Sequence, residues 1–350
     1  MVEVLSLAEA RSVLSERVLA CLDGLDAALR EDVRGALALE GKLLHQPGTE
    51  LDGRWALLPF CLARALNTTT RNSPASFEAA RDVALAMECV VCATDLLDDV
   101  MDDDVTTLIE QLGMARVLNV ALALVSLSQR MLLALLELDV PITLPARLMD
   151  MMQRAILLAS SGQQRDLLAE RRPACELTRE ECLEIAAAKA GALLSLACQM
   201  GAVCAGVGDA ELALCAETGR LLGIAAQLDN DAHDLSELLL VTGQKKQGKS
   251  DLARGKKTLP IVLAAHSLGA GPLRDVHALD FRHLERLSGE IQERALQALR
   301  EGIIATWGIA LLYRERARET LVSLLDEQAL SPDLLHIMGL EYELVERNSA

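Results

Sequence analysis

Aromatic residues are scarce in this sequence: they make up 2% of 350 residues, although hydrophobic residues make up 51%. A core with so few aromatics has to be built from Ala, Leu, Val, Ile and Met, a composition that favours helices. No short stretch alternates apolar and polar side chains as a half-buried strand does, and apolar residues recur at helical spacing nearly throughout. These patterns predict an all-α fold.

A basic excess is also missing. Lys and Arg number 34 against 51 Asp and Glu, which gives a net charge of −17 and no basic stripe. This balance disfavours nucleic acid and anionic membrane as partners. A metal cation suits the chain better.

Long uncharged apolar runs are absent too. A membrane-spanning helix needs ~20 such residues, and the best candidate, 117–136, carries Gln129 and Arg130 in its middle. The first twenty residues lack the basic start and unbroken apolar core of a signal peptide. We therefore expect a cytoplasmic protein without stable membrane insertion. The nine cysteines are scattered and odd in number, so we interpret them, including the pair Cys89 and Cys92, as reduced core thiols.

Helix-breaking segments divide the chain into about ten or more helices. None of these segments is long or biased enough to be an interdomain linker, and no internal repeat is present. The sequence therefore predicts one domain over residues 1–350.

Six aspartates fall within residues 95–104, inside a segment that otherwise has the pattern of a buried helix. On a helix, Asp98 and Asp102 lie one turn apart with Asp99 beside them, so three carboxylates converge. This cluster is either a solvated acidic helix end or part of a magnesium site, since Mg²⁺ prefers oxygen ligands and commonly joins carboxylates to substrate phosphates. Asp95, one turn earlier, suits a hydrogen-bond network, a catalytic base or an extra metal contact.

A second acidic group favours the magnesium interpretation. Asn230, Asp231 and Asp234 share a helical face, and two oxygen-rich groups on separate helices suit a clamp around a diphosphate and several Mg²⁺ ions. His233, between them, either contacts the diphosphate or is a polar residue on the outer face. Three basic residues are predicted to hold phosphate oxygens: Lys189, Lys249 and Lys256.

Five blocks follow one another in the sequence: DDVMD (98–102), GQQRD (162–166), Lys189, QLDNDAHD (227–234) and GKSDLARGKKTLP (248–260). In their order and spacing, and over roughly residues 38 to 265, the sequence resembles the trans-isoprenyl diphosphate synthases, the polyprenyl synthetase family. The resemblance implies a class I isoprenoid synthase fold, with helices around a central cavity, and a homodimer. It also implies an enzyme that ionises an allylic isoprenyl diphosphate with three Mg²⁺ ions.

The resemblance assigns roles by position. Asp98, Asp99 and Asp102 would hold two ions, and Asn230, Asp231 and Asp234 the third. The residues that would line the diphosphate and the allylic cation are Gln163, Asp166, Lys189, Gln227 and Lys256.

The basic pocket that holds isopentenyl diphosphate in chain-elongating members is largely missing. In EGKLLHQP (40–47), Lys42 is kept but His45 stands where the family has arginine. Val91 stands where the family has His or Gln, and DDVTTL (103–108) replaces an Arg-Arg pair. Histidine is a poor substitute for a forked guanidinium.

Three functions follow. The first, which we favour from the sequence, is magnesium-dependent ionisation of an allylic isoprenyl diphosphate with release of diphosphate, by a terpene synthase or prenyltransferase that lacks a normal isopentenyl diphosphate site. The second is a chain-elongating polyprenyl or geranylgeranyl diphosphate synthase. The third is a non-catalytic regulatory subunit of a heteromeric synthase.

Substrate length is predicted from the helix that carries DDVMD. The positions where the family places a floor against the prenyl tail are Ala93 and Thr94, both small. We therefore expect these residues to line a deep cavity that favours geranylgeranyl diphosphate or longer chains.

Overall fold

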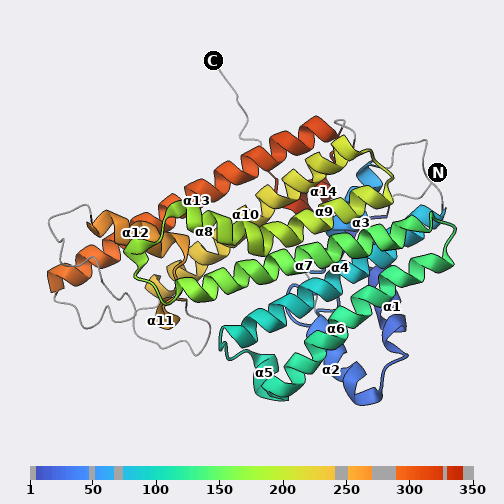
Figure 1. Cartoon of the computed structure of the whole chain (residues 1–350), viewed down its shortest axis with the longest axis horizontal. Helices are drawn as coiled ribbons and strands as arrows, with labels where there is room; N and C mark the ends of the chain where they lie inside the picture. The colour runs from blue at the N-terminus through green and yellow to red at the C-terminus, as the bar shows by residue number, and fades with distance from the viewer. Residues whose placement is uncertain are drawn as a thin grey trace. The chain divides into compact units, whose positions relative to one another are not determined.

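The computed structural model describes residues 5–46, 52–66, 74–240, 251–269, 289–325 and 329–341. Within these ranges it contains α-helices α1 to α14, three short helical segments and no β-strand, so the predicted all-α fold is confirmed (Figure 1). The chain divides into two compact units. The prediction of one domain over the whole chain stays a prediction.

Unit 1 comprises residues 1–153, 196–218 and 318–350. Its helices are α1 (Leu7–Leu22), α2 (Ala27–Leu37), α3 (Arg54–Leu66), α4 (Pro74–Met101), α5 (Thr107–Leu112), α6 (Met114–Ala134), the short helix η1 (Leu135–Glu137) and α14 (Pro332–Met338).

Unit 2 comprises residues 154–195 and 219–317. Its elements are η2 (Ala174–Glu176), α8 (Arg179–Ala186), η3 (Ala187–Gly191), α11 (Asp251–Arg254) and α12 (Leu259–Gly269). Four helices contain a unit boundary: α7 (Thr143–Ala169), α9 (Ala192–Cys204), α10 (Asp209–Leu240) and α13 (Gly289–Leu324).

Helix α4 lies in the centre of unit 1. It packs along α6 on one side and against α3 on another (Figure 1). From Ala79 to Ala93 its side chains are almost all buried, because this stretch consists mainly of Ala, Val, Leu, Met and Cys. Burial on all sides explains why the helix lacks a clean amphipathic pattern until the aspartates begin.

Two apolar clusters form the core of unit 2. One joins the end of α10 to α11, α12 and the first half of α13, through residues such as Leu235, Ile261 and Leu299. The other joins α8, α10 and α12 through Cys182, Leu228 and Val262. Most of these side chains are Ala, Leu, Ile or Val, as the composition predicts. All nine cysteines are free thiols, and Cys89 and Cys92 are buried.

Three described segments are long and apolar enough to cross a membrane, by length and composition alone. They are Met114–Glu137, Arg179–Cys204 and Gly289–Leu324. The absence of stable membrane insertion and the cytoplasmic location stay predictions.

Candidate active site

The first acidic cluster lies at the C-terminal end of α4. Asp98 and Asp99 are partly exposed, whereas Asp102 is 2% exposed. The backbone N–H of Asp104 donates to the carbonyl of Asp99 at 2.9 Å, and Asp103 has a φ of 51°, a left-handed conformation that Asp tolerates better than most residues. A helix C-terminus is negatively polarised, and the last turn of α4 has no basic residue. A cation is therefore the group that would stabilise this end.

The second acidic group lies on α10, in unit 2. Asn230 and Asp234 are exposed and Asp231 is partly buried. Gln227 Nε2 donates to Asp231 Oδ1 at 2.9 Å, so one predicted site residue orients another. His233 is exposed, and its Nε2 lies 3.5 Å from a glutamate one turn later. This position matches the interpretation of His233 as a polar residue on the outer face.

Lys189 lies in η3, a single π-helical turn between α8 and α9. Its Nζ donates to Asp166 Oδ2 of α7 at 2.8 Å, and both side chains are mostly buried. Gln163, one turn before Asp166 on α7, is 5% exposed. A charge-assisted pair with little exposure holds the ammonium in a defined position, and π turns occur frequently at functional sites. Lys189 and Asp166 were both predicted from the sequence, and the structure brings them together.

Glycines allow two helices to approach the π turn closely. A Cβ on Gly162 of α7 would lie 2.9 Å from the backbone nitrogen of Lys189. A Cβ on Gly223 of α10 would lie 2.4 Å from the carbonyl oxygen of Ala190. No side chain fits at either position without movement of backbone. The close approach fixes the segment that carries Lys189 between α7 and α10.

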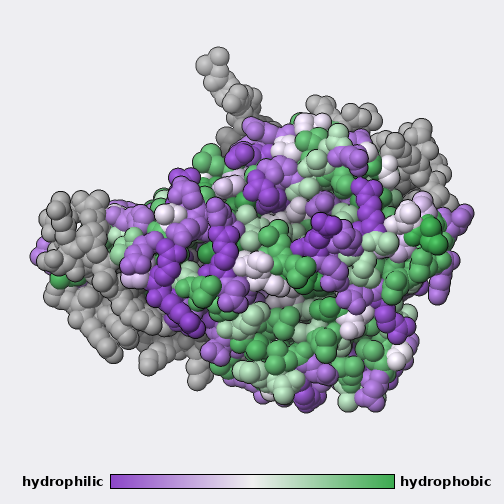
Figure 2. All heavy atoms as spheres, viewed as in Figure 1, coloured by the Kyte–Doolittle hydropathy of each residue, from purple (hydrophilic) through white to green (hydrophobic). Residues whose placement is uncertain are grey.

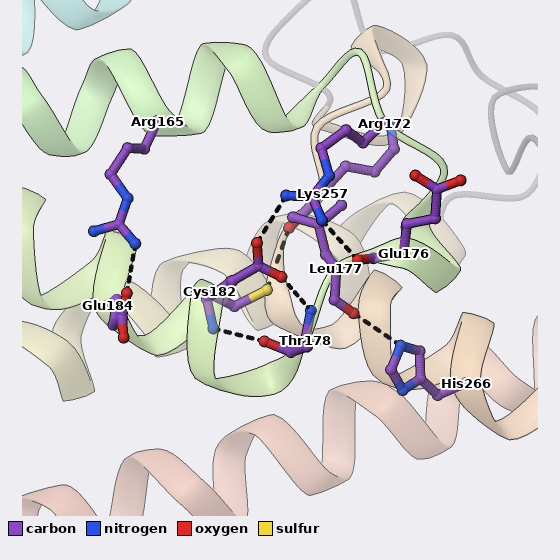
Figure 3. Close-up of polar contacts among 10 residues, drawn as sticks. Arg165, Arg172, Glu176, Leu177, Thr178, Cys182, Glu184, Lys257 and His266 are labelled. Atoms are coloured by element: carbon purple, nitrogen blue, oxygen red, sulfur yellow. Dashed lines mark hydrogen bonds and ion pairs between the residues drawn. The ribbon is translucent and has the colours of Figure 1, made fainter.

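A set of polar contacts holds the turn that carries Lys256 (Figure 3). The neighbouring Lys257 donates from Nζ to the carbonyls of Glu170, at 3.2 Å, and of Gly255. The Cys182 thiol donates to the carbonyl of Lys257 at 3.7 Å. Lys256 itself is partly buried. The turn is thereby tied to the end of α7 and to α8.

The segment after α7 is held by its own contacts (Figure 3). Arg172 pairs with Glu181 at 2.7 Å, and this pairing, with the backbone N–H of Thr178, lowers the pKa of Glu181 to about 2. His266 Nε2 lies 2.8 Å from the carbonyl of Leu177. Arg165 pairs with Glu184 at 2.5 Å. These residues were not predicted, and their role is to fix the segments around the predicted ones.

Lys42 and His45, the two residues assigned by position to the isopentenyl diphosphate pocket, both face carboxylates of their own chain. Lys42 is buried and forms an ion pair with Asp95 of α4. His45 Nδ1 lies 3.0 Å from Oδ2 of Asp52, which is 2% exposed. Of the three roles considered for Asp95, the ion pair matches the hydrogen-bond network.

The remaining predicted residues stand apart from these contacts. Ala93 is fully buried and Thr94 partly buried, its hydroxyl donating to the carbonyl of Val91 at 2.9 Å. Lys249 lies outside the described residues. Among the residues that the structure describes, no group of three or more His, Cys, Asp or Glu side chains is arranged to hold a metal ion. The carboxylate and amide oxygens on α4 and α10 are chemically suited to Mg²⁺, and the set of three ions stays a prediction.

Comparison with known proteins identifies the family. The model of the polyprenyl synthetase family matches residues 54–278, which include both acidic groups, Lys189 and Lys256. The chain belongs to the polyprenyl synthetase family. It is 35% identical to a geranylgeranyl diphosphate synthase of Mycobacterium tuberculosis over 193 aligned residues. The alignment covers 54% of this chain and 53% of that protein. Alignments to the first curated relatives span from 33% to 60% of their lengths.

Solved structures of this family share the fold. A crystal structure of a geranylgeranyl pyrophosphate synthase matches with a TM-score of 0.74 at 22% identity, over 97% of this chain and 100% of that one. A polyprenyl synthase from Caulobacter crescentus, solved with calcium and isoprenyl diphosphate, matches with a TM-score of 0.73 at 22% identity, over 95% and 94%. The isoprenoid synthase fold expected from the five sequence blocks is confirmed.

Proposed function

We propose that this polyprenyl synthetase is a Mg²⁺-dependent prenyltransferase that ionises an allylic isoprenyl diphosphate and joins the cation to isopentenyl diphosphate. One observation carries the proposal: the matched family region contains both oxygen-rich helix faces and the buried Lys189–Asp166 pair. The curated relatives include a geranylgeranyl diphosphate synthase and a geranylfarnesyl diphosphate synthase. They therefore favour elongation over the first of the three functions predicted from the sequence.

The proposed reaction breaks the bond between C1 of the allylic substrate and its diphosphate oxygen, and the electron pair leaves with the diphosphate. Mg²⁺ ions held by Asp98, Asp99 and Asp231 would neutralise this leaving group. Lys189, held in place by Asp166 at 2.8 Å, would add a fixed positive charge to it. The double bond of isopentenyl diphosphate then forms the new carbon–carbon bond, and a proton is lost from the product.

A second function has an observation in its favour. Lys42 is the one clearly retained basic residue of the isopentenyl diphosphate pocket, and its ammonium group is paired with Asp95. His45, which stands at the arginine position of the same motif, faces Asp52. This arrangement supports ionisation without chain elongation, in which the substrate's own double bonds, proton loss, water or another acceptor ends the reaction. It is the activity of a terpene synthase or of a different prenyltransferase.

Product analysis separates the candidates. The full-length protein is incubated with geranyl, farnesyl or geranylgeranyl diphosphate and Mg²⁺, each with and without isopentenyl diphosphate. A longer linear diphosphate, formed only when isopentenyl diphosphate is present, is the expected result. A hydrocarbon or alcohol from the allylic substrate alone would support the second function. No Mg²⁺-dependent diphosphate release from any substrate would refute both and support a regulatory subunit.

The same assay tests the predicted preference for long chains. We expect geranylgeranyl diphosphate or longer chains to be favoured over geranyl diphosphate, because Ala93 and Thr94 are small. Thr94→Phe and Ala93→Phe should each shift the preference to shorter chains by placing a ring in the tail's path. Since Ala93 is fully buried and Thr94 only partly, Thr94→Phe is the variant more compatible with folding. An unchanged preference in a folded Thr94→Phe protein would show that the tail does not follow this face.

A further inference from the structure

The ammonium group of Lys42 lies inside unit 1, and its partner carboxylate lies at the surface. The side chain of Lys42 is 9% exposed and that of Asp95 is 55% exposed. Lys42 follows α2, where its backbone N–H donates to the carbonyl of Leu39 at 3.0 Å. The ion pair therefore joins a buried, anchored lysine to an aspartate that has solvent on one side.

Lys42 faces a row of side chains on α4. Glu88, Cys92 and Asp95 follow one another at helical spacing on the part of α4 near Lys42. Burial raises the pKa of Cys92 to about 12, so this thiol is neutral. Glu88 Oε1 accepts the backbone N–H of Leu43 at 2.7 Å, which binds the residue after Lys42 to the same helix face.

The charge of Lys42 is kept despite its burial. Burial alone favours the neutral amine, but the nearby carboxylate of Asp95 raises the pKa of Lys42 above its ordinary value overall. A charged, buried ammonium requires an anionic partner, and Asp95 is that partner here. A phosphate group that approached Lys42 would have to displace this carboxylate or accept its repulsion.

We propose that Asp95 is a specificity-determining residue that weakens the binding of a second diphosphate by holding Lys42 in an internal ion pair. The ligand class is a phosphorylated homoallylic substrate, isopentenyl diphosphate, and this identification rests on the proposed function. Asp95 is the replaceable member of the pair because it is the exposed one. Removal of its charge leaves Lys42 buried, anchored and ready to accept an anion.

Binding measured without metal tests this directly. Isothermal titration of the full-length protein with isopentenyl diphosphate, and separately with inorganic pyrophosphate, is carried out in EDTA so that the aspartate clusters cannot bind through Mg²⁺. Asp95→Asn keeps the size and hydrogen-bonding capacity of the side chain but removes its charge. We expect it to bind both ligands roughly tenfold to hundredfold more tightly than the unmodified protein, the effect of one hydrogen bond to a charged group.

Two further variants assign the effect to Lys42. The double variant Lys42→Met with Asp95→Asn should lose the gain. Asp139→Asn, which removes the same charge from an exposed position between η1 and α7, should leave the affinity unchanged. If Asp139→Asn matches the gain of Asp95→Asn, general charge repulsion explains the result and the proposal is wrong.

The single variant Lys42→Met keeps the proposal testable if Asp95→Asn does not fold. In the unmodified protein Lys42 is held by Asp95, so Lys42→Met should change ligand affinity by less than about threefold, well below the effect of one charged hydrogen bond. A loss of affinity of tenfold or more in Lys42→Met would mean that Lys42 already binds the diphosphate, and would overturn the proposal. A folded Asp95→Asn variant whose affinity is no higher than that of the parent protein would overturn it as well. The binding measurements do not depend on enzymatic turnover. The product assay tests the proposed prenyl transfer, so failure of that function can be distinguished from failure of the proposal about Asp95.

Discussion

Asp98 and Asp99 are the residues on which the proposed chemistry depends most directly. Asp98→Ala and Asp99→Ala should each reduce Mg²⁺-dependent diphosphate release at least about a hundredfold, comparable with the loss of one group that stabilises developing charge. The helical circular dichroism spectrum and the melting temperature should be kept or improved, because each change removes like charge from a helix C-terminus. Asn230→Asp, which supplies an equivalent oxygen ligand, should be mild by comparison. Full turnover by both alanine variants would exclude the α4 cluster as a metal site.

Glu88 is a fully buried acid whose protonation should affect folding stability. Burial raises its pKa above the ordinary value, and its Oε2 atom has no hydrogen-bond partner in the structure. A carboxyl group with a raised folded-state pKa stabilises the fold below the unfolded pKa and loses that contribution as the pH rises through the folded value. In the Glu88→Gln variant, the glutamine side chain cannot ionise but can still accept a hydrogen bond from the backbone N–H of Leu43. The variant protein should therefore resist urea better than the parent protein at pH 8, and the difference in their unfolding free energies should be smaller at pH 5. A difference that grows as the pH falls would contradict this assignment.

The residues predicted from the sequence were those whose type and spacing carry chemical information. Lys189 and Asp166 belong to separate blocks, and their ion pair could not be read from either one. Glu88 was missed, although a single acid in an apolar stretch, seven residues before Asp95 and on the same helix face, was a usable signal. Lys42 was predicted as a remnant of a phosphate site, but the carboxylate opposite it comes from a distant segment. Ion pairs between segments that are distant in the sequence therefore could not be predicted from the spacing of residues along the chain.

At the scale of elements, the packing of α10 against the π turn is sensitive to a single methyl group. Gly223→Ala should lower the free energy of unfolding by about 1–3 kcal/mol, the usual cost of overpacking, because the new Cβ would meet backbone atoms of Ala190 and Gly191 within 2.6 Å. The matched control is Gly308→Ala in α13, where a Cβ would meet nothing within 4 Å. That change should be neutral or stabilising by up to about 1 kcal/mol. Urea titration measures both, and equal effects would mean that the close approach is not the cause.

The helices themselves were predictable, but their local form was not. Apolar spacing predicts helix throughout residues 179–204, as observed. The π turn lies within AAAKAG (186–191), and no residue in this stretch signals a departure from a regular α-helix. A π turn and an α turn bury similar side chains, so periodicity does not distinguish them. The close approaches of Gly162 and Gly223 depend on which helices are neighbours, which is information from the whole fold.

For the whole molecule, the predicted homodimer can be examined through α6. Leu118 and Leu122 are 42% and 66% exposed on the same face of this helix, and Figure 2 shows hydrophobic residues gathered over the region where α5 and α6 lie. Unpaired apolar faces of this kind commonly mark subunit contacts. Leu122→Glu should shift the protein from dimer to monomer in sedimentation velocity, whereas Leu312→Glu, at an equally exposed leucine of α13, should not. A monomeric parent protein would make the dimer prediction wrong.

The π turn has a consequence for how this chain can vary. A hydrogen bond from residue i to i+5 spans one residue more than an α turn, so the five residues of η3 occupy the length of roughly four. Deletion of one residue from the turn would therefore leave an ordinary α turn, with α8 and α9 near their present relative orientation. The same deletion within α8 or α9 would instead rotate one side of the helix by about 100° relative to the other. The turn is therefore the place in residues 179–204 where the length of the chain can change with least disturbance to the flanking helices, although Lys189 would lose its present position.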